Sequence, residues 1–303
     1  MAFMSHQRSS VASPEVFNTA VRHFQQGQLR EADKICRQIL KADPQHADAL
    51  HLQGVIAIGT GHYKEAARLL RQALRINPAA PFYHSNLGLA FQNQGLSDEA
   101  LEAYNRALEL NPGIAEAHMN SGNILRERGM FDEAEQRLRA ALQINPSLAS
   151  AHYNLGLVLQ NKNQAQAAQG CYERALSLQP DLPGARVNLG VIYKDLGRYD
   201  DAVQQYQLAL QITPDSAEAY NNLGIALNDM GRFEDAVKAC RTALDLDPDN
   251  AEIHYNLGFA LKGQKTIGEA IAAYETSLAM NADNPSAVCE LVHRLQHVCD
   301  WEK

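Results

Sequence analysis

The sequence predicts an all-α solenoid of stacked helix pairs, because three kinds of residue recur every 34 positions. Seven prolines, seven glycines and seven alanines each keep this interval without an insertion, beginning at Pro44, Gly54 and Ala66. Between successive prolines lie two stretches with apolar residues at helical period, separated by a short turn that often contains glycine, as at Gly61. Each interval therefore predicts two helices, and proline ends the second one.

The register divides the chain into eight units, and we expect a different organisation at both ends. The units are 13–46, 47–80, 81–114, 115–148, 149–182, 183–216, 217–250 and 251–284. The first is degenerate, with Ala20 in the glycine row, and the eighth has Ala282 in place of proline. Terminal units of a stacked array meet solvent on one side and often diverge. We expect residues 1–12 to form a disordered tail and residues 285–303 a partial ninth repeat that ends the array as a capping helix.

Composition limits the function classes. The 303 residues include 27 Lys and Arg and 35 Asp and Glu, so the net charge of −8 argues against binding to nucleic acid or to an anionic membrane surface. No stretch approaches the length of a membrane-spanning helix, and the N-terminus lacks the apolar core of a signal peptide. The five cysteines are dispersed, which favours reduced thiols in a cytoplasmic protein.

The 34-residue unit resembles the tetratricopeptide repeat family over nearly the whole chain. The resemblance implies a right-handed superhelix in which the first helix of each unit lines a concave face. It also implies a protein that binds extended polypeptides or other proteins. A carboxylate clamp, as found in relatives that bind a chaperone C-terminus, is not expected. The fifth residue of each unit, counted from the first residue of its range and called position five, lacks the required lysines. Its residues include His51, Ser85, Met119 and Val187.

An asparagine row occupies position six of six consecutive units and provides the candidate site. Its members are Asn86, Asn120, Asn154, Asn188, Asn222 and Asn256. Asparagine is a mediocre helix former, whereas its amide both donates and accepts hydrogen bonds and so suits the backbone of an extended peptide. A structural role between neighbouring helices is the alternative. Asp195 and Asp229 are further groove candidates that would favour a ligand with hydroxyl or basic side chains, although solvated surface charge is the simpler and slightly favoured explanation.

The C-terminal string resembles the junction that precedes the catalytic region in O-linked N-acetylglucosamine transferases and SPINDLY-type relatives. The matching residues are His293, Leu295, Gln296, Val298, Cys299, Asp300 and Trp301. The resemblance implies that the asparagine row holds an acceptor polypeptide for a protein O-glycosyltransferase with an N-acetylglucosamine or fucose donor. Asp195 also matches a groove aspartate of that family. We expect this chain to lack the catalytic lobes and to transfer nothing alone. A non-enzymatic scaffold, which could self-associate as a homo-oligomer, is the alternative.

No cofactor or metal site is expected. His84, His118, His152 and His254 share position four, but adjacent members would lie about 10 Å apart, too far to share one metal ion. Cys289, His293 and His297 share one helix face, which cannot surround a tetrahedral ion without a second element. We interpret the four histidines as packing or groove residues, and we expect the helix of the second group to dock on the preceding unit.

Overall fold

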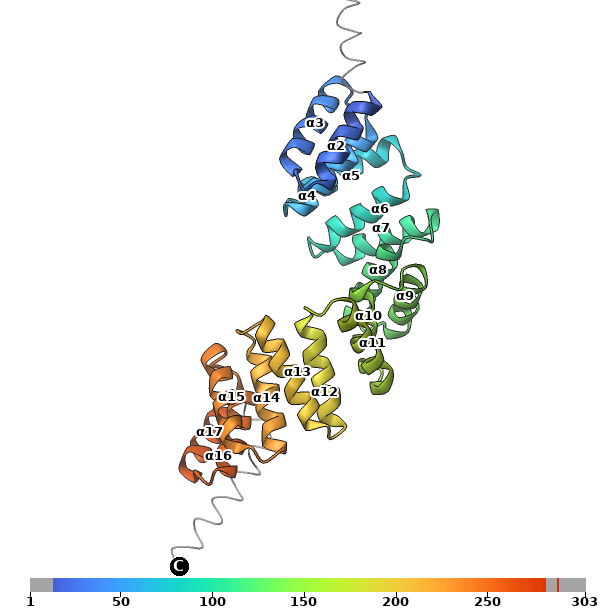
Figure 1. The fold of residues 1–303 in the computed structure, drawn as a ribbon. Helices are drawn as coiled ribbons and strands as arrows, with labels where there is room; N and C mark the ends of the chain where they lie inside the picture. Colours follow the sequence, from blue (N-terminus) through green and yellow to red (C-terminus); the bar gives the residue numbers. More distant parts are fainter. Residues whose placement is uncertain (1–12, 282–287, 289–303) are drawn as a thin grey trace, which may run out of the picture. The chain divides into compact units, whose positions relative to one another are not determined.

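The protein is described here by a computed structural model that covers residues 13–281 and Val288. It contains sixteen α-helices and no strand within those residues, which confirms the predicted all-α solenoid. The chain forms two compact units, Met1–Lys162 and Asn163–Lys303, each described by itself (Figure 1). The predicted tail and the partial ninth repeat lie outside the described residues, apart from Val288.

The helices alternate between a first and a second member of each pair. The first helices are α2 (Pro14–Gln25), α4 (Ala47–Gly59), α6 (Pro81–Gln92), α8 (Ala115–Glu127), α10 (Ala149–Asn161), α12 (Pro183–Asp195), α14 (Ala217–Asp229) and α16 (Ala251–Gly263). The second helices are α3 (Leu29–Ala42), α5 (Tyr63–Ile76), α7 (Ser97–Leu110), α9 (Phe131–Ile144), α11 (Ala165–Leu178), α13 (Tyr199–Ile212), α15 (Phe233–Leu246) and α17 (Ile267–Met280). None of them is long and apolar enough to cross a membrane, within the part of the chain that the structure describes.

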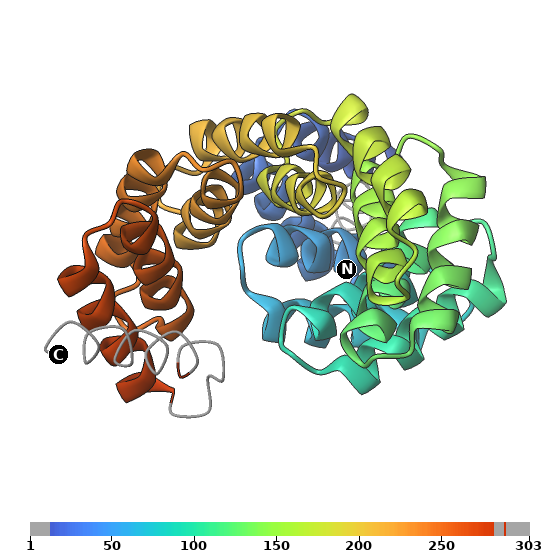
Figure 2. The ribbon, with the colours of Figure 1, turned by 90° about the horizontal axis from the view of Figure 1, so that it is seen from below.

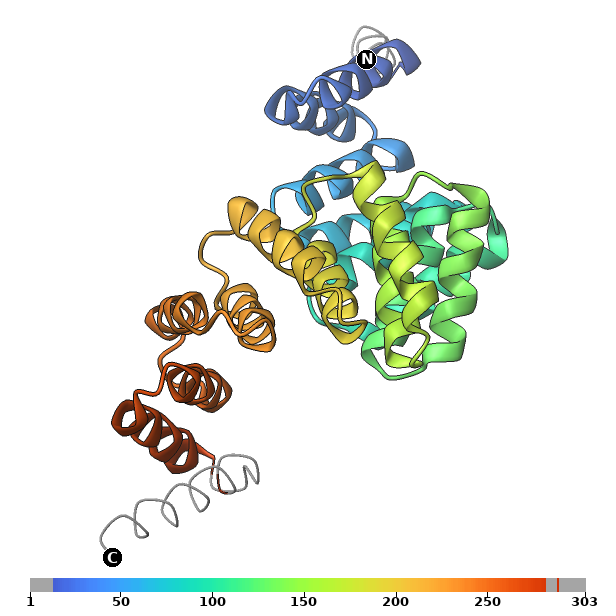
Figure 3. The same cartoon turned by 60° about the horizontal axis from the view of Figure 1, so that its bottom comes forward.

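Helices that follow one another in the chain pack side by side within each unit. In the C-terminal unit the pairs α12–α13, α14–α15 and α16–α17 follow in order from yellow to red (Figure 2), and a smaller rotation shows the same succession (Figure 3). First helices also contact the next first helix, as α4 does with α6 and α14 does with α16. Within each unit, we call the surface that the first helices form the first-helix face, and the opposite surface the second-helix face.

The glycine row marks where the two helices of a pair cross. A Cβ atom on Gly88 would lie 2.7 Å from the ring of Tyr104, and one on Gly190 would lie 2.6 Å from the ring of Tyr206. Leu70, Leu138, Cys240 and Tyr274 occupy the same place opposite the glycines of their own pairs. The second helix therefore inserts a large side chain where the first helix has none, and both tyrosines are fully buried.

The turn between the two helices of a pair contains one residue in the left-handed backbone conformation, which glycine adopts readily. Gly61, Gly95, Gly129, Gly197 and Gly231 have φ between 73° and 78°. In two units another residue adopts this conformation, Asn163 with φ 58° and Lys265 with φ 65°. Asparagine tolerates the left-handed region, whereas lysine does so only at a cost in energy.

Candidate peptide-binding face

The asparagine row lies on the first helices, two residues before the glycine of each helix. Two residues of an α-helix turn through about 200°. Because Gly88, Gly122, Gly190, Gly224 and Gly258 face the second helix of their own pairs, the asparagine two residues before each of them points to the opposite side, toward the first-helix face. Three of the six belong to the N-terminal unit and three to the C-terminal unit. Their side chains differ in what they already bind.

Asn86 and Asn256 hydrogen-bond to position five of the preceding repeat. The Nδ2 of Asn86 donates to Nε2 of His51 over 2.7 Å, and the Nδ2 of Asn256 donates to Oδ1 of Asn221 over 2.9 Å. Asn221 and Asn256 are each only 9% exposed, so this second bond is buried. These two members of the row hold neighbouring first helices together, as the structural alternative anticipated.

The side chains of Asn120 and Asn188 each make one hydrogen bond within their own unit. Asn188 donates from Nδ2 to the backbone carbonyl of Gly184, one turn earlier in its own helix, over 2.9 Å. Asn120 hydrogen-bonds to the Tyr104 phenol. Burial raises the pKa of Tyr104 above its ordinary value, and the bond from Asn120 opposes that rise.

Asn154 and Asn222 have no hydrogen-bond partner within residues 13–281, and both side chains are partly exposed. The sequence explains the difference. Position five of the repeat before Asn154 is Met119, and that before Asn222 is Val187, neither of which offers the acceptor that His51 and Asn221 provide. A comparison of position six with the preceding position five would have identified these free amides from sequence alone.

The two candidate aspartates lie at the C-terminal ends of their first helices. Asp195 ends α12, is exposed, and has its carboxylate 3.4 Å from the ammonium group of Lys194. Asp229 ends α14 and is exposed. It borders a cavity of about 440 Å³ between α14, α15 and α16 that Phe233 and Phe259 also line.

The floor of that cavity contains a polar atom without a partner. Asn228 is 7% exposed and donates from Nδ2 to the carbonyl of Asn256 over 3.3 Å. Its Oδ1 is buried and accepts no hydrogen bond from the described residues. An N–H or O–H group of a ligand that reached this floor would satisfy the oxygen. Sequence reasoning named Asp229 but missed Asn228.

The histidine row braces the turns between repeats, a role that the sequence interpretation missed. Each histidine bonds through Nε2 to the backbone carbonyl of the proline six residues earlier. The four pairs are His84 with Pro78, His118 with Pro112, His152 with Pro146 and His254 with Pro248, at 2.9 to 3.1 Å. Arg186 makes the equivalent bond to Pro180 from its guanidinium. A fixed six-residue separation between histidine and proline is the sequence signal of this brace.

Within the described ranges, no three His, Cys, Asp or Glu side chains gather closely enough to hold a metal ion. Cys289, His293 and His297 lie outside those ranges. Cys36, Cys171 and Cys240 form no disulfide bond within the described residues. Burial raises the pKa of Cys36 and Cys240 to about 12, which leaves both as unreactive thiols near neutral pH.

Comparison with known proteins identifies the repeat. Models described as "TPR repeat" match residues 122–163, 192–231 and 226–265. Models described as "Tetratricopeptide repeat" match 23–88, 81–114, 103–136, 149–182, 171–204 and 251–284. No curated protein matches the chain.

Solved structures share the fold. The APC/C hetero-tetramer Cut9-Hcn1 matches 88% of this chain and 52% of its own chain at 19% identity, with a TM-score of 0.65. This chain therefore spans about half the length of that relative. Pseudomonas aeruginosa pilF matches 68% of this chain and 94% of its own at 26% identity, with a TM-score of 0.63. YrrB, described as a TPR protein with an unusual peptide-binding site, matches 63% of this chain and 98% of its own chain at 23% identity, with a TM-score of 0.56. With helix pairs at a 34-residue period and family models matched from residue 23 to residue 284, this chain belongs to the tetratricopeptide repeat family.

Proposed function

We propose that this chain is a cytoplasmic protein-binding domain that holds extended polypeptides through asparagine amides on its first-helix face. The observation that carries the proposal is that Asn154 in the N-terminal unit and Asn222 in the C-terminal unit each have a partly exposed amide with no partner among the described residues. Such an amide donates to a peptide carbonyl and accepts from a peptide N–H. Each bond contributes only about 0.5–1.5 kcal/mol net, so binding requires several of them at once.

The six members of the asparagine row differ in how readily their amides can bind a peptide. Asn154 and Asn222 bind a ligand without giving up an existing bond, whereas Asn86 and Asn256 first have to release His51 and Asn221. Asn120 and Asn188 are intermediate, because each retains amide atoms beyond the bond it makes. Asp195 and Asp229 add carboxylates for hydroxyl or basic side chains of the bound segment.

The double variant Asn154→Ala with Asn222→Ala tests this assignment. The probe is a fluorescein-labelled, unstructured peptide of about twenty residues rich in Ser and Thr, long enough to span several repeats at about 3.3 Å per residue. We expect its affinity to fall about tenfold, with an unchanged circular dichroism spectrum and unfolding midpoint. Asn105→Ala on α7 is the control on a second helix, where Asn105 is exposed. Asn105 accepts a hydrogen bond from Arg137 over 2.8 Å, so the unfolding midpoint of this control is measured together with its affinity. Equal affinity of the double variant and the wild type would rule out peptide binding through the asparagine row.

We further propose that the parent protein is a nucleotide-sugar-dependent protein O-glycosyltransferase, for which this domain selects acceptor proteins. The support is the resemblance of residues 293–301 to the junction before the catalytic region, a segment outside the described residues. The residues encoded after Lys303 test it. Two nucleotide-sugar-binding lobes in the reading frame would support the proposal, and a stop codon there would leave the non-enzymatic scaffold.

A scaffold that assembles protein complexes is the second candidate. Cut9 was solved within a hetero-tetramer with Hcn1, and YrrB is described as having a peptide-binding site. Both likenesses concern the fold alone, since each identity is below 25%. Size-exclusion chromatography with light scattering tests the associated expectation that this chain forms a homo-oligomer.

A further inference from the structure

The second helices of the first two repeats carry a cationic surface that the net charge of the chain conceals. Residues 1–76 hold 10 of the 27 Lys and Arg and 6 of the 35 Asp and Glu, which gives a net charge of +4. Residues 77–303 hold the other 17 basic and 29 acidic residues, which gives −12. The positive charge is concentrated on two helices.

Four exposed positions on each of these helices are basic. On α3 they are Arg30, Lys34, Arg37 and Lys41, and on α5 they are Lys64, Arg68, Arg71 and Arg75. The two sets are separated by the 34-residue period, so they occupy equivalent places in their repeats. We call these eight residues the cationic surface.

The repeats themselves show that the fold does not require these cations. At the 24 equivalent positions of the six later second helices, only Arg139, Lys238 and Arg241 are basic. On α13 three of the four equivalent residues are glutamines, namely Gln204, Gln207 and Gln211. The same structural position thus accepts a neutral side chain elsewhere in this chain.

Local electrostatics account for only part of the cationic surface, since Lys41 and Arg75 lie in the last turn of their helices, where the helix dipole favours a cation. Arg30 and Lys64 each occupy the second residue of their helix, where the helix dipole disfavours a cation. Arg37 pairs with Asp33 at 2.8 Å and Arg68 pairs with Glu65 at 2.5 Å. The Arg71 guanidinium lies 4.9 Å from the centroid of the Phe91 ring. The remaining five members have no ion pair within the described residues, namely Arg30, Lys34, Lys41, Lys64 and Arg75.

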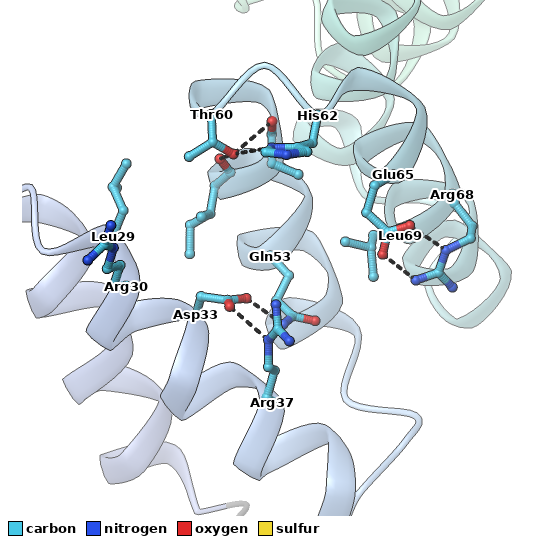
Figure 4. A pocket seen from close by; sticks show the side chains of 12 residues that line it. Leu29, Arg30, Asp33, Arg37, Gln53, Thr60, His62, Glu65, Arg68 and Leu69 are labelled. Atoms are coloured by element: carbon cyan, nitrogen blue, oxygen red, sulfur yellow. Dashed lines mark hydrogen bonds and ion pairs between the residues drawn. The ribbon is translucent and has the colours of Figure 1, made fainter.

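A groove runs between α3 and α5, with α4 as its floor (Figure 4). One part, of about 510 Å³, is bordered by Arg30, Arg37 and Arg68, with Ile56 and Leu69 among its apolar lining. The continuing part, of about 440 Å³, shares Gln53, Arg68 and Leu69 with the first and reaches Arg75 and Ile76. Its walls carry four members of the cationic surface, Arg30, Arg37, Arg68 and Arg75, beside the carboxylates of Asp33 and Glu65, and its floor is largely apolar.

The polar side chain on the floor of the groove is Gln53, whose amide is hydrogen-bonded to the α3 wall. Gln53, which is 9% exposed, donates from Nε2 to Oδ1 of Asp33 over 2.8 Å, and Arg37 donates to the other oxygen of the same carboxylate (Figure 4). Asp33 is thereby neutralised within the wall of the groove. Glu65, which also borders the groove, pairs with Arg68, so a bound anion would meet both carboxylates already paired. Arg30 and Arg75 would face it without an ion pair from the described residues.

We propose that this groove docks an acidic segment of a partner protein, in which glutamate or aspartate side chains flank one or two large apolar side chains. Charge complementarity accounts for the cationic walls, and the apolar floor accounts for the hydrophobic side chains. A nucleic-acid backbone has no aliphatic side chain for this floor, and a flat membrane surface does not enter a groove between two helices. The docking surface is separate from the asparagine row, so either proposal can fail without the other.

The probe is a fluorescein-labelled peptide in which glutamates flank a Leu-Phe pair, measured by fluorescence anisotropy. We expect saturable binding that weakens at least tenfold between about 0.05 M and 0.3 M salt, as screening of exposed charges requires. Replacing the glutamates with glutamine, or the Leu-Phe pair with serines, should each weaken binding at least fivefold. No detectable binding at millimolar peptide would overturn the proposal. So would equal or tighter binding of a poly-dT oligonucleotide or of phosphatidylserine vesicles.

The decisive variant is Arg68→Gln with Arg75→Gln, which copies Gln204 and Gln211 of α13 onto α5. Arg71 is kept, because its guanidinium lies over the Phe91 ring and borders neither part of the groove. The double variant should retain the fold and bind the peptide at least tenfold more weakly. Lys238→Gln with Arg241→Gln on α15 is the matched control, because it removes cations from equivalent positions of another repeat and should leave affinity unchanged. Ile76→Gln tests the apolar floor at a side chain that is 40% exposed, and we expect a severalfold loss. Unchanged binding by the Arg68 and Arg75 double variant, or an equal loss in the control, would refute docking in this groove.

Discussion

Asn86 on α6 donates a hydrogen bond from Nδ2 to Nε2 of His51 on α4, over 2.7 Å. The His51 ring also stacks on Tyr83, with 4.3 Å between ring centroids. Because Nε2 accepts this bond, His51 is neutral and carries its proton on Nδ1. A residue that sequence reasoning assigned to ligand binding therefore also joins two repeats, and it does so only while His51 is unprotonated.

This bond predicts that acid weakens the junction between α4 and α6. Burial lowers the pKa of His51 to about 4, against an opposing effect of the Asp48 carboxylate. The unfolded chain binds a proton near pH 6.5 and the folded chain does not, so this contribution to stability is complete above pH 6.5. It decreases as the pH falls toward 4, by on the order of 3 kcal/mol. An NMR titration of the His51 ring measures the pKa directly.

The matched variant for this prediction is His51→Phe, which keeps an aromatic ring beside Tyr83 and has the residue that the first repeat carries at this position, Phe17. The difference in unfolding free energy between wild type and variant should change between pH 7 and pH 4. Parallel stability curves for the two proteins, or a His51 pKa near 6.5, would contradict the assignment.

The glycine row predicts opposite effects for two glycine-to-alanine substitutions. Gly88→Ala places a Cβ 2.7 Å from the fully buried Tyr104 ring, and we expect a loss of about 1–3 kcal/mol from overpacking. Gly170→Ala on α11 meets nothing within 4 Å and should stabilise the protein by about 0.5–1 kcal/mol, because glycine is a poor helix former. Urea unfolding of both variants checks the prediction, and a loss of stability in both would show that the crossing geometry does not distinguish them.

The left-handed turns predict a reciprocal exchange between Lys265 and Gly231. These residues occupy the same place in adjacent repeats, with φ of 65° and 73°. Lys265→Gly relieves a conformation that costs a non-glycine residue about 1–2 kcal/mol, so we expect a gain approaching that size, reduced by the greater freedom of glycine in the unfolded chain. Gly231→Lys should lose a similar amount. Thermal unfolding midpoints that move the same way in both variants would contradict this explanation.

The sequence predicts the fold well and the state of each candidate side chain poorly, for one physical reason. The 34-residue rows determine helix pairing because Gly88 and its counterparts leave room for one large residue opposite, so a pattern within one unit suffices. The role of an asparagine depends instead on a residue 35 positions earlier in the neighbouring unit, such as His51 for Asn86. The binding role of the asparagine row and of Asp195 and Asp229 therefore stays a prediction.

The last prediction separates the structural and ligand-binding members of the asparagine row. Asn256→Ala removes the donor to Asn221 and leaves its Oδ1 unpaired in a buried place, so we expect a loss of about 1–3 kcal/mol. Asn222→Ala removes no hydrogen bond among the described residues and should leave stability within about 0.5 kcal/mol of the wild type. Unfolding in urea, compared with affinity for the Ser- and Thr-rich peptide, gives the two readouts. The row is divided as proposed if Asn256→Ala mainly lowers stability and Asn222→Ala mainly lowers affinity. Equal stability of the two variants would mean that the buried bond to Asn221 does not hold α14 and α16 together, because the two substitutions remove the same atoms from adjacent repeats.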